Sequence, residues 1–355
     1  MMEIIFIIGT LLVGVLFGFV LQRGRFCMVS AFRDPLVMKE YNLLKAVAIA
    51  IAVEMIGFLI LVGLNVIPAL NPKPFNYVAN IVGGLVFGVG AAFAGGCASG
   101  TSYRIGEGMV GSFVAMLGLA IVGVATSSSE GILNWISTYL NQWSIGVADG
   151  GDLINNNNLT LANIFGPQMW IPIVIVVIIV AIFGVLIYWH TKKKTDYKLK
   201  MPDNILKSIF KNGWNFWITG IAIGVVGTIA FAVNYWAGKL YPLGITGGWN
   251  SVLNILSLGY SKMNVFTWIV LGVVIGAAVA ALIAGEFKFR SPKAKTLLKQ
   301  FVGGGLMGFG AAVAGGCNIG HGLSGVPMLS IGSIVTLACI IVSIWIVSYF
   351  LFMRD

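Results

Sequence analysis

The sequence predicts an all-α integral membrane protein built from two repeats, and three observations carry that prediction. Of the 355 residues, 58% are hydrophobic and only 10% are charged, whereas soluble domains carry about 25% charged residues. The mean hydropathy of +0.94 places the chain among membrane proteins. The third observation is a duplication, because residues 82–100, VGGLVFGVGAAFAGGCASG, recur at 302–320 as VGGGLMGFGAAVAGGCNIG.

Nine apolar stretches have close to the length of about 20 residues that a helix needs to cross a bilayer. They cover residues 4–22, 43–64, 78–96, 109–126, 170–190, 214–237, 265–286, 300–316 and 331–353. No basic region precedes the first stretch, so we interpret it as a retained helix and not as a cleaved signal peptide. The third and eighth stretches are short and interrupted by glycine, which predicts half-helices that need not cross completely.

The net charge of +10 is concentrated in loops and predicts an orientation, not a nucleic-acid partner. Seven lysines lie in residues 191–213, and residues 23–42 and 286–299 are also basic, whereas residues 127–168 contain neither Lys nor Arg. Short basic loops stay in the cytoplasm. We therefore expect a multi-pass protein with its N-terminus and residues 127–168 outside and its C-terminus in the cytoplasm.

With this orientation, the two copies of the duplicated segment run in opposite directions across the membrane. We expect one transmembrane domain in three parts. Residues 1–126 form a first inverted repeat, residues 127–213 hold an outer loop, a linking helix and a basic cytoplasmic loop, and residues 214–355 form a second inverted repeat. Such repeats place a transport site near the middle of the membrane, where glycine-interrupted helices meet.

Both copies break at the same Gly-Gly-Cys, so Gly96-Cys97 and Gly316-Cys317 are the first candidates for a substrate pathway. Polar side chains that could satisfy the freed backbone or bind an anion follow each break. They are Ser99, Thr101, Asn318 and His321. Cysteine as a small apolar filler of a helix break is the simpler explanation for one such residue, but not for two at one repeat position. Four cysteines fit no zinc spacing and no disulfide scaffold, so no catalytic centre, metal or cofactor is expected.

Other candidates are less symmetric. Cys27 lies among three arginines, where positive charge would favour a thiolate or attract an anion, although an ordinary basic flank with an incidental cysteine is the better explanation of this residue taken alone. Cys339 lies in the uniformly apolar last stretch and is interpreted as core. Charged residues at membrane depth are costly and usually functional, which singles out Glu54, Arg104 and Glu107. Glu54 could pair with Arg104 or relay protons, and a structural ion pair is the alternative.

Three motifs resemble those of the YeeE/YedE family of bacterial inner-membrane transporters for sulfur compounds: GRFCM around Cys27, AGGCASGT around Cys97 and AGGCNIGHGLSG around Cys317. The resemblance implies an hourglass-like bundle of about nine spanning helices with short re-entrant helices. It also implies that the three cysteines line a conduit and relay thiosulfate by thiol hydrogen bonds. Some members of the family handle selenium compounds, and some work with a small cytoplasmic TusA-like sulfur-carrier protein.

We therefore predict a thiosulfate importer of the bacterial inner membrane, and three alternatives stay open. They are a selenium-compound transporter of the same family, a membrane thiol–disulfide or sulfurtransferase enzyme, and a general small-solute pore. The enzyme is disfavoured because the chain contains no Cys-x-x-Cys pair. Weak thiol donors in series would let a dianion bind and still leave, while half-helix N-termini and backbone N–H groups would supply positive potential without a lysine.

Overall fold

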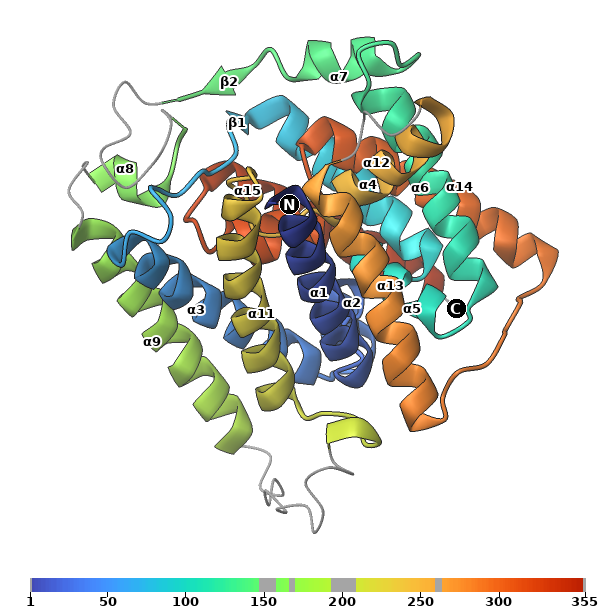
Figure 1. Ribbon diagram of the computed structural model, residues 1–355, viewed down its shortest axis with the longest axis horizontal. Helices are drawn as coiled ribbons and strands as arrows, with labels where there is room; N and C mark the ends of the chain where they lie inside the picture. Colours follow the sequence, from blue (N-terminus) through green and yellow to red (C-terminus); the bar gives the residue numbers. More distant parts are fainter. Residues whose placement is uncertain (1, 147–157, 166–169, 193–208, 259–263, 354–355) are drawn as a thin grey trace.

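The computed structural model describes residues 2–146, 158–165, 170–192, 209–258 and 264–353, which are mostly helical (Figure 1). Within these ranges, nine segments are long and apolar enough to cross a membrane, and this confirms the predicted all-α membrane class. The sheet of the described part is one short antiparallel pair, β1 (Phe75–Asn76) with β2 (Ser144–Ile145). Most of the predicted basic loop 191–213 and part of the predicted outer loop lie outside the described residues.

The N-terminal half alternates long helices with short helices that follow a break. The long helices are α1 (Met2–Arg23), α3 (Asn42–Gly63), α4 (Tyr77–Ala94) and α6 (Val110–Ser127), and the short ones are α2 (Met28–Val37) and α5 (Ala98–Gly106). Between the halves lie α7 (Asn134–Leu140), α8 (Leu161–Phe165) and the long α9 (Trp170–Lys192). The long helix α9 is the predicted linking helix.

The C-terminal half repeats the order of the first. Its elements are α11 (Phe216–Trp236), α12 (Ile245–Leu258), α13 (Val265–Ala284), α14 (Ala294–Ala314), the short π-helix η2 (Gly320–Gly325) and α15 (Ile331–Phe352). Packing follows the same correspondence: α1 packs on α13 as α11 packs on α3, and α14 packs on α6 as α4 packs on α15. Each of these contacts has a counterpart in which every helix is replaced by the corresponding helix of the other half, and this supports the predicted pair of repeats.

The helices α4 and α14, which contain the duplicated sequence, pack against each other in opposite directions. Gly83 in the first half of α4 lies against Gly310 and Ala314 near the end of α14, whereas Gly90 lies against Gly303. A methyl group at Gly83 would lie 2.6 Å from the backbone nitrogen of Ala314, so glycine is what allows the two backbones to approach. This antiparallel contact supports the predicted inversion of the two copies.

The helix boundaries differ from the apolar stretches where charge or polarity hides a helix. Helix α14 begins at Ala294, earlier than the predicted stretch 300–316, because its first turns contain Lys295 and Lys299 and therefore have low hydropathy. The short helices α2, α5 and α12 lie outside every predicted stretch, because each is too short or too polar to show as a spanning segment. These short helices position the candidate site.

Candidate functional site

Each of the three motif cysteines is the residue before a short helix. Cys27 precedes α2 and Cys97 precedes α5, both in extended backbone conformation, and Cys317 precedes the short helical segment that continues into η2. Gly95 and Gly315 end α4 and α14 with φ of 75° and 78°, in the left-handed region that glycine adopts at little cost. The repeated Gly-Gly-Cys therefore ends one helix, turns the chain and starts another.

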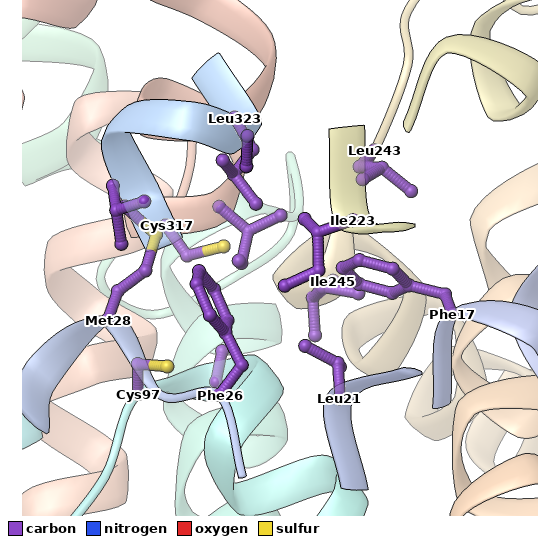
Figure 2. Close-up of a cluster of buried hydrophobic side chains, with 14 of the residues drawn as sticks. Phe17, Leu21, Phe26, Met28, Cys97, Ile223, Leu243, Ile245, Cys317 and Leu323 are labelled. Atoms are coloured by element: carbon purple, nitrogen blue, oxygen red, sulfur yellow. The ribbon is translucent and has the colours of Figure 1, made fainter. Parts of the chain in front are cut away.

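Two of the predicted cysteines are in direct contact. The sulfur atoms of Cys27 and Cys97 lie 3.7 Å apart, and both residues are buried. Figure 2 shows Cys97 and Cys317 in one buried cluster with Phe26 and Met28. The structure thus gathers the three motif cysteines from three separate segments and pairs two of them.

The Cys97 thiol has further partners within its own loop. Its sulfur lies 3.3 Å from the Ser99 hydroxyl and accepts a hydrogen bond from the Gly100 backbone N–H at 3.3 Å. A methyl group at Gly100 would lie 2.7 Å from the Cys27 sulfur. Gly100 therefore makes room for the thiol pair, a role that its position in the sequence alone did not indicate.

Two buried polar atoms near these thiols have no hydrogen-bond partner in the described part of the chain. They are Thr101 Oγ1 and Asn318 Nδ2, and each residue is at most 1% exposed. The Asn318 side chain interacts with Cys97, so it lies between the two repeated breaks. An unpaired buried polar group costs free energy unless a partner fills the gap. The Thr101 hydroxyl is therefore available to a polar solute, and the Asn318 amide lies beside it at the Cys97 sulfur.

His321, which the sequence also singled out, is engaged with the protein on both ring nitrogens. Nδ1 lies 3.1 Å from the Ser333 hydroxyl, and Nε2 lies 3.1 Å from the Ala314 carbonyl oxygen. The ring therefore joins η2 to the end of α14 and the start of α15. This geometry gives His321 a structural role at the second break.

On one side of the thiols, Cys317 lines a pocket of about 340 Å³ with two lysines and a tyrosine. We call it the Lys73 pocket. Its lining includes the half-buried Lys73 together with Lys239 and Tyr241. The Lys73 ammonium donates a hydrogen bond to the Gly315 carbonyl oxygen. Its Nζ lies 4.7 Å from the centre of the Tyr241 ring. From the sequence we expect no lysine beside the thiols, but the structure places Lys73 in the pocket that Cys317 lines.

Burial and the neighbouring Lys239 give the Lys73 ammonium an unusual acidity. Burial, the larger effect, lowers the pKa of Lys73 to about 8, while the interaction with Cys317 acts in the opposite direction. Lys73 is the only basic residue between Lys45 and Arg104. In the predicted orientation the loop that contains Lys73 lies outside, where basic residues are depleted, and a lone lysine there is the sequence signal that would have drawn attention to it.

A second pocket of about 470 Å³ lies at the other end of α5, and we call it the Arg104 pocket. Its charged lining residues are Arg25, Arg104, Glu107, Glu286, Lys288 and Arg290. Arg104 donates a hydrogen bond of 2.7 Å to the Gly95 carbonyl oxygen. Cations therefore bind the carbonyl groups that end α4 and α14 at both copies of the break.

The predicted ion pair between Glu54 and Arg104 is not formed. Glu54 is fully buried in α3 against Gly227 of α11, and neither of its oxygens has a hydrogen-bond partner in the described ranges. Glu107 instead accepts a hydrogen bond of 3.1 Å from Gln22. The position of Glu54 within an apolar stretch of the sequence marks it as unusual. That position does not determine which neighbouring helix its side chain faces.

Comparison with known proteins places the chain in a family. Residues 23–346 match the family model described as sulphur transport. The thiosulfate transporter TsuA of Spirochaeta thermophila is 38% identical over 350 residues, which cover 97% of this chain and 98% of the relative. TsuA of Escherichia coli is 31% identical over 98% of this chain and 95% of its own length. The probable transporter YedE of Salmonella typhimurium is 33% identical over 44% of this chain and 35% of its own length.

The chain therefore belongs to the YeeE/YedE sulphur transport family, as its three cysteine motifs indicated. Membership in a family of transporters confirms the predicted class, a transporter and not an enzyme.

Proposed function

We propose that this member of the sulphur transport family imports thiosulfate through a conduit lined by Cys27, Cys97 and Cys317. Two relatives named thiosulfate transporters align over nearly the whole chain, whereas the match to YedE of Salmonella typhimurium covers 44% of it. Full-length similarity supports thiosulfate over the selenium alternative. The observation that carries the mechanism is the buried thiol pair with the unpaired Thr101 hydroxyl and the Asn318 amide close to it.

The segments that contain Cys97 and Cys317 reach one pocket each. Cys317 lines the Lys73 pocket, and its neighbour Asn318 interacts with Cys97. Helix α5 then runs from Cys97 to Arg104, which lines the other pocket. At a rise of about 1.5 Å per residue, the nine residues of α5 cover about 14 Å.

The thiols hold the anion weakly, which is what conduction needs. A dianion cannot cross hydrocarbon unaided, but short helices begin at all three cysteines and direct partial positive charge toward them. Thiols are weak donors with a soft, polarizable sulfur. Because no fixed charge binds the anion at the pair itself, it can also leave.

The proposed order of contact along the conduit starts at Cys317. The orientation predicted from the basic loops would place Cys97 next and Cys27 last, toward the cytoplasm. Since the last two sulfur atoms lie 3.7 Å apart, we propose instead that Cys97 and Cys27 hold the anion together as one station. Thr101 and Asn318 would then donate to its oxygen atoms.

We further propose that the protein lies in the bacterial inner membrane with the Lys73 pocket outside and the Arg104 pocket in the cytoplasm. The distribution of basic residues supports this orientation. In intact cells, a membrane-impermeant maleimide should label Thr138→Cys in α7 but not Lys295→Cys in α14. Both positions are exposed, so the opposite labelling would reverse the orientation.

A small TusA-like sulfur-carrier protein is the proposed cytoplasmic recipient. Lys288 and Arg290 line the Arg104 pocket beside α5, and exposed cations make association sensitive to salt. Co-purification that persists at low salt and weakens in Lys288→Glu would support this partner. Binding to the unmodified chain that no salt or charge change affects would exclude this docking site.

Growth on thiosulfate as the sole sulfur source tests the central proposal. A bacterial strain without its own thiosulfate and sulfate uptake should grow when it expresses this chain, and should accumulate radiolabelled thiosulfate. Uptake of intact thiosulfate into vesicles that contain only this protein separates transport from sulfurtransferase chemistry. Correct membrane insertion without any uptake would contradict the proposal.

A further inference from the structure

Lys73 belongs to the first half of the chain, but its ammonium lies on the Gly-Gly-Cys break of the second half. The residue comes from the loop between α3 and α4 and bonds the Gly315 carbonyl. A methyl group at Gly316 would contact the Lys73 Nζ. The ammonium therefore covers the turn that leads to Cys317, inside the Lys73 pocket.

The first copy carries its own cation at the corresponding place. There, Arg104 in the last turn of α5 bonds the Gly95 carbonyl. The position that corresponds to Arg104 in the second copy is Ser324, whose hydroxyl donates to the Leu243 carbonyl. Lys73 thus supplies from another segment the cation that the second copy lacks.

We propose that Lys73 is the capture residue of the pathway: its ammonium exchanges the Gly315 carbonyl for an incoming sulfur oxyanion and brings that anion to the Cys317 thiol. This inference rests on the proposed transport function and adds a binding residue to it. Lys239 lines the same pocket, and its described lining residues include no Asp or Glu. The pocket is therefore positive, and an oxyanion that reaches it has no carboxylate to repel it.

Lysine suits an exchange of partners better than arginine does. Its ammonium is a compact charge on a flexible stem with rotatable donors. The resting contacts of Lys73 are one carbonyl oxygen and the face of the Tyr241 ring. A dianion offers the ammonium a full charge-assisted hydrogen bond, which is stronger than a bond to a neutral carbonyl.

The charge of Lys73 depends on pH in the range where cells live. The groups that interact with it are Cys317, Lys239, Tyr241 and His321. Because burial lowers the pKa of Lys73 to about 8, the ammonium is charged below pH 8 and becomes neutral as the pH rises through that value. Burial raises the pKa of Tyr241, so its hydroxyl stays neutral over the same range.

Uptake of radiolabelled thiosulfate into vesicles that contain the purified protein tests the role of Lys73. We expect Lys73→Met to raise the apparent KM by about tenfold, as expected for the loss of one hydrogen bond to a charged group, with the rate at saturating thiosulfate nearly unchanged. Lys239→Met, at an exposed residue of the same pocket, is the matched control and should raise KM by only about twofold.

The pH profile provides a second measurement that does not require removal of the cation. In the unmodified protein, the apparent KM should rise as the external pH is raised through 8, whereas Lys73→Arg keeps its charge and should show no such rise. A KM unchanged in Lys73→Met, or the same pH profile in Lys73→Arg, would overturn the inference. If Cys317→Ala still lowered uptake by about tenfold, the transport function would stand; absence of uptake by the unmodified protein would instead refute that function.

Discussion

The two Gly-Gly-Cys breaks have the same backbone turn but different surroundings. At the first break, the Cys97 thiol contacts a second thiol at 3.7 Å, and a guanidinium from the same copy bonds the Gly95 carbonyl. At the second, Cys317 lines a pocket, and an ammonium from the other half bonds the Gly315 carbonyl. The two turns are thus alike, and their neighbours differ: Cys27 from the same half completes a buried thiol pair at the first, whereas Lys73 from the other half lies in an open pocket at the second.

Removal of the thiols should have the largest effect on thiosulfate uptake. We expect Cys97→Ala to lower thiosulfate uptake by about 100-fold, because it removes both a sulfur contact and the partner of Cys27, and Cys317→Ala to lower it by about tenfold. Cys97→Ser keeps a donor without the polarizable sulfur and should be intermediate. Cys339→Ala in α15 is the control and should transport normally. Normal uptake in Cys97→Ala with loss in Cys339→Ala would invert the assigned roles.

A matched pair of glycines tests whether the thiol pair at the first break matters for uptake, since Gly100 and Gly320 occupy the same position in the two copies. The methyl group of Gly100→Ala would lie 2.7 Å from the Cys27 sulfur and 3.3 Å from the Cys97 sulfur. That of Gly320→Ala would lie 3.5 Å from its nearest neighbour, an ordinary contact. We expect uptake to fall about tenfold in Gly100→Ala and to stay normal in Gly320→Ala.

Both substitutions favour helix formation, so a difference between them should not reflect loss of the helix. The midpoint of thermal unfolding in detergent checks that the two variants are equally folded. Equal uptake by Gly100→Ala and Gly320→Ala would show that the thiol pair tolerates separation.

Competition by sulfate should give the smallest effect. Sulfate and thiosulfate carry the same charge, so Lys73 attracts both, and only a thiol placed against the terminal sulfur distinguishes them. We expect excess sulfate to compete at least tenfold less well than unlabelled thiosulfate, a difference of about 1.4 kcal/mol. Cys317→Ser should narrow that difference. Equal inhibition in the unmodified protein would exclude sulfur recognition.

The long helices were predictable from the sequence because their burial in lipid requires uninterrupted apolar residues. Helices α2 and α5 were not, since a short helix at a break is held by its neighbours and needs no apolar run of its own. Helix α5, for instance, has the sequence ASGTSYRIG, and its Ser102 hydroxyl accepts a hydrogen bond of 2.8 Å from Trp249 in α12. Such a contact is a property of the assembled bundle.

In the candidate site, too, some residues could be predicted from the sequence and others depend on the assembled bundle. Cys97 and Cys317 could be found because duplication marks them within the chain itself. Lys73 could not be assigned to the site, because its bond to Gly315 joins residues that are 242 positions apart. The ion pair expected for Glu54 was wrong because Glu54 packs against Gly227 of α11, and the sequence does not specify which helices meet.

The glycine contacts between α4 and α14 have a consequence for the speed of transport. A methyl group at Gly83 or Gly310 would clash with the opposite backbone, so the two halves meet as a close-packed frame with little freedom to rock. Rotation of side chains takes picoseconds to nanoseconds, whereas collective motion of domains takes microseconds to milliseconds. An ion that passes by rearrangement of thiols and an ammonium alone does not wait for the slower class of motion.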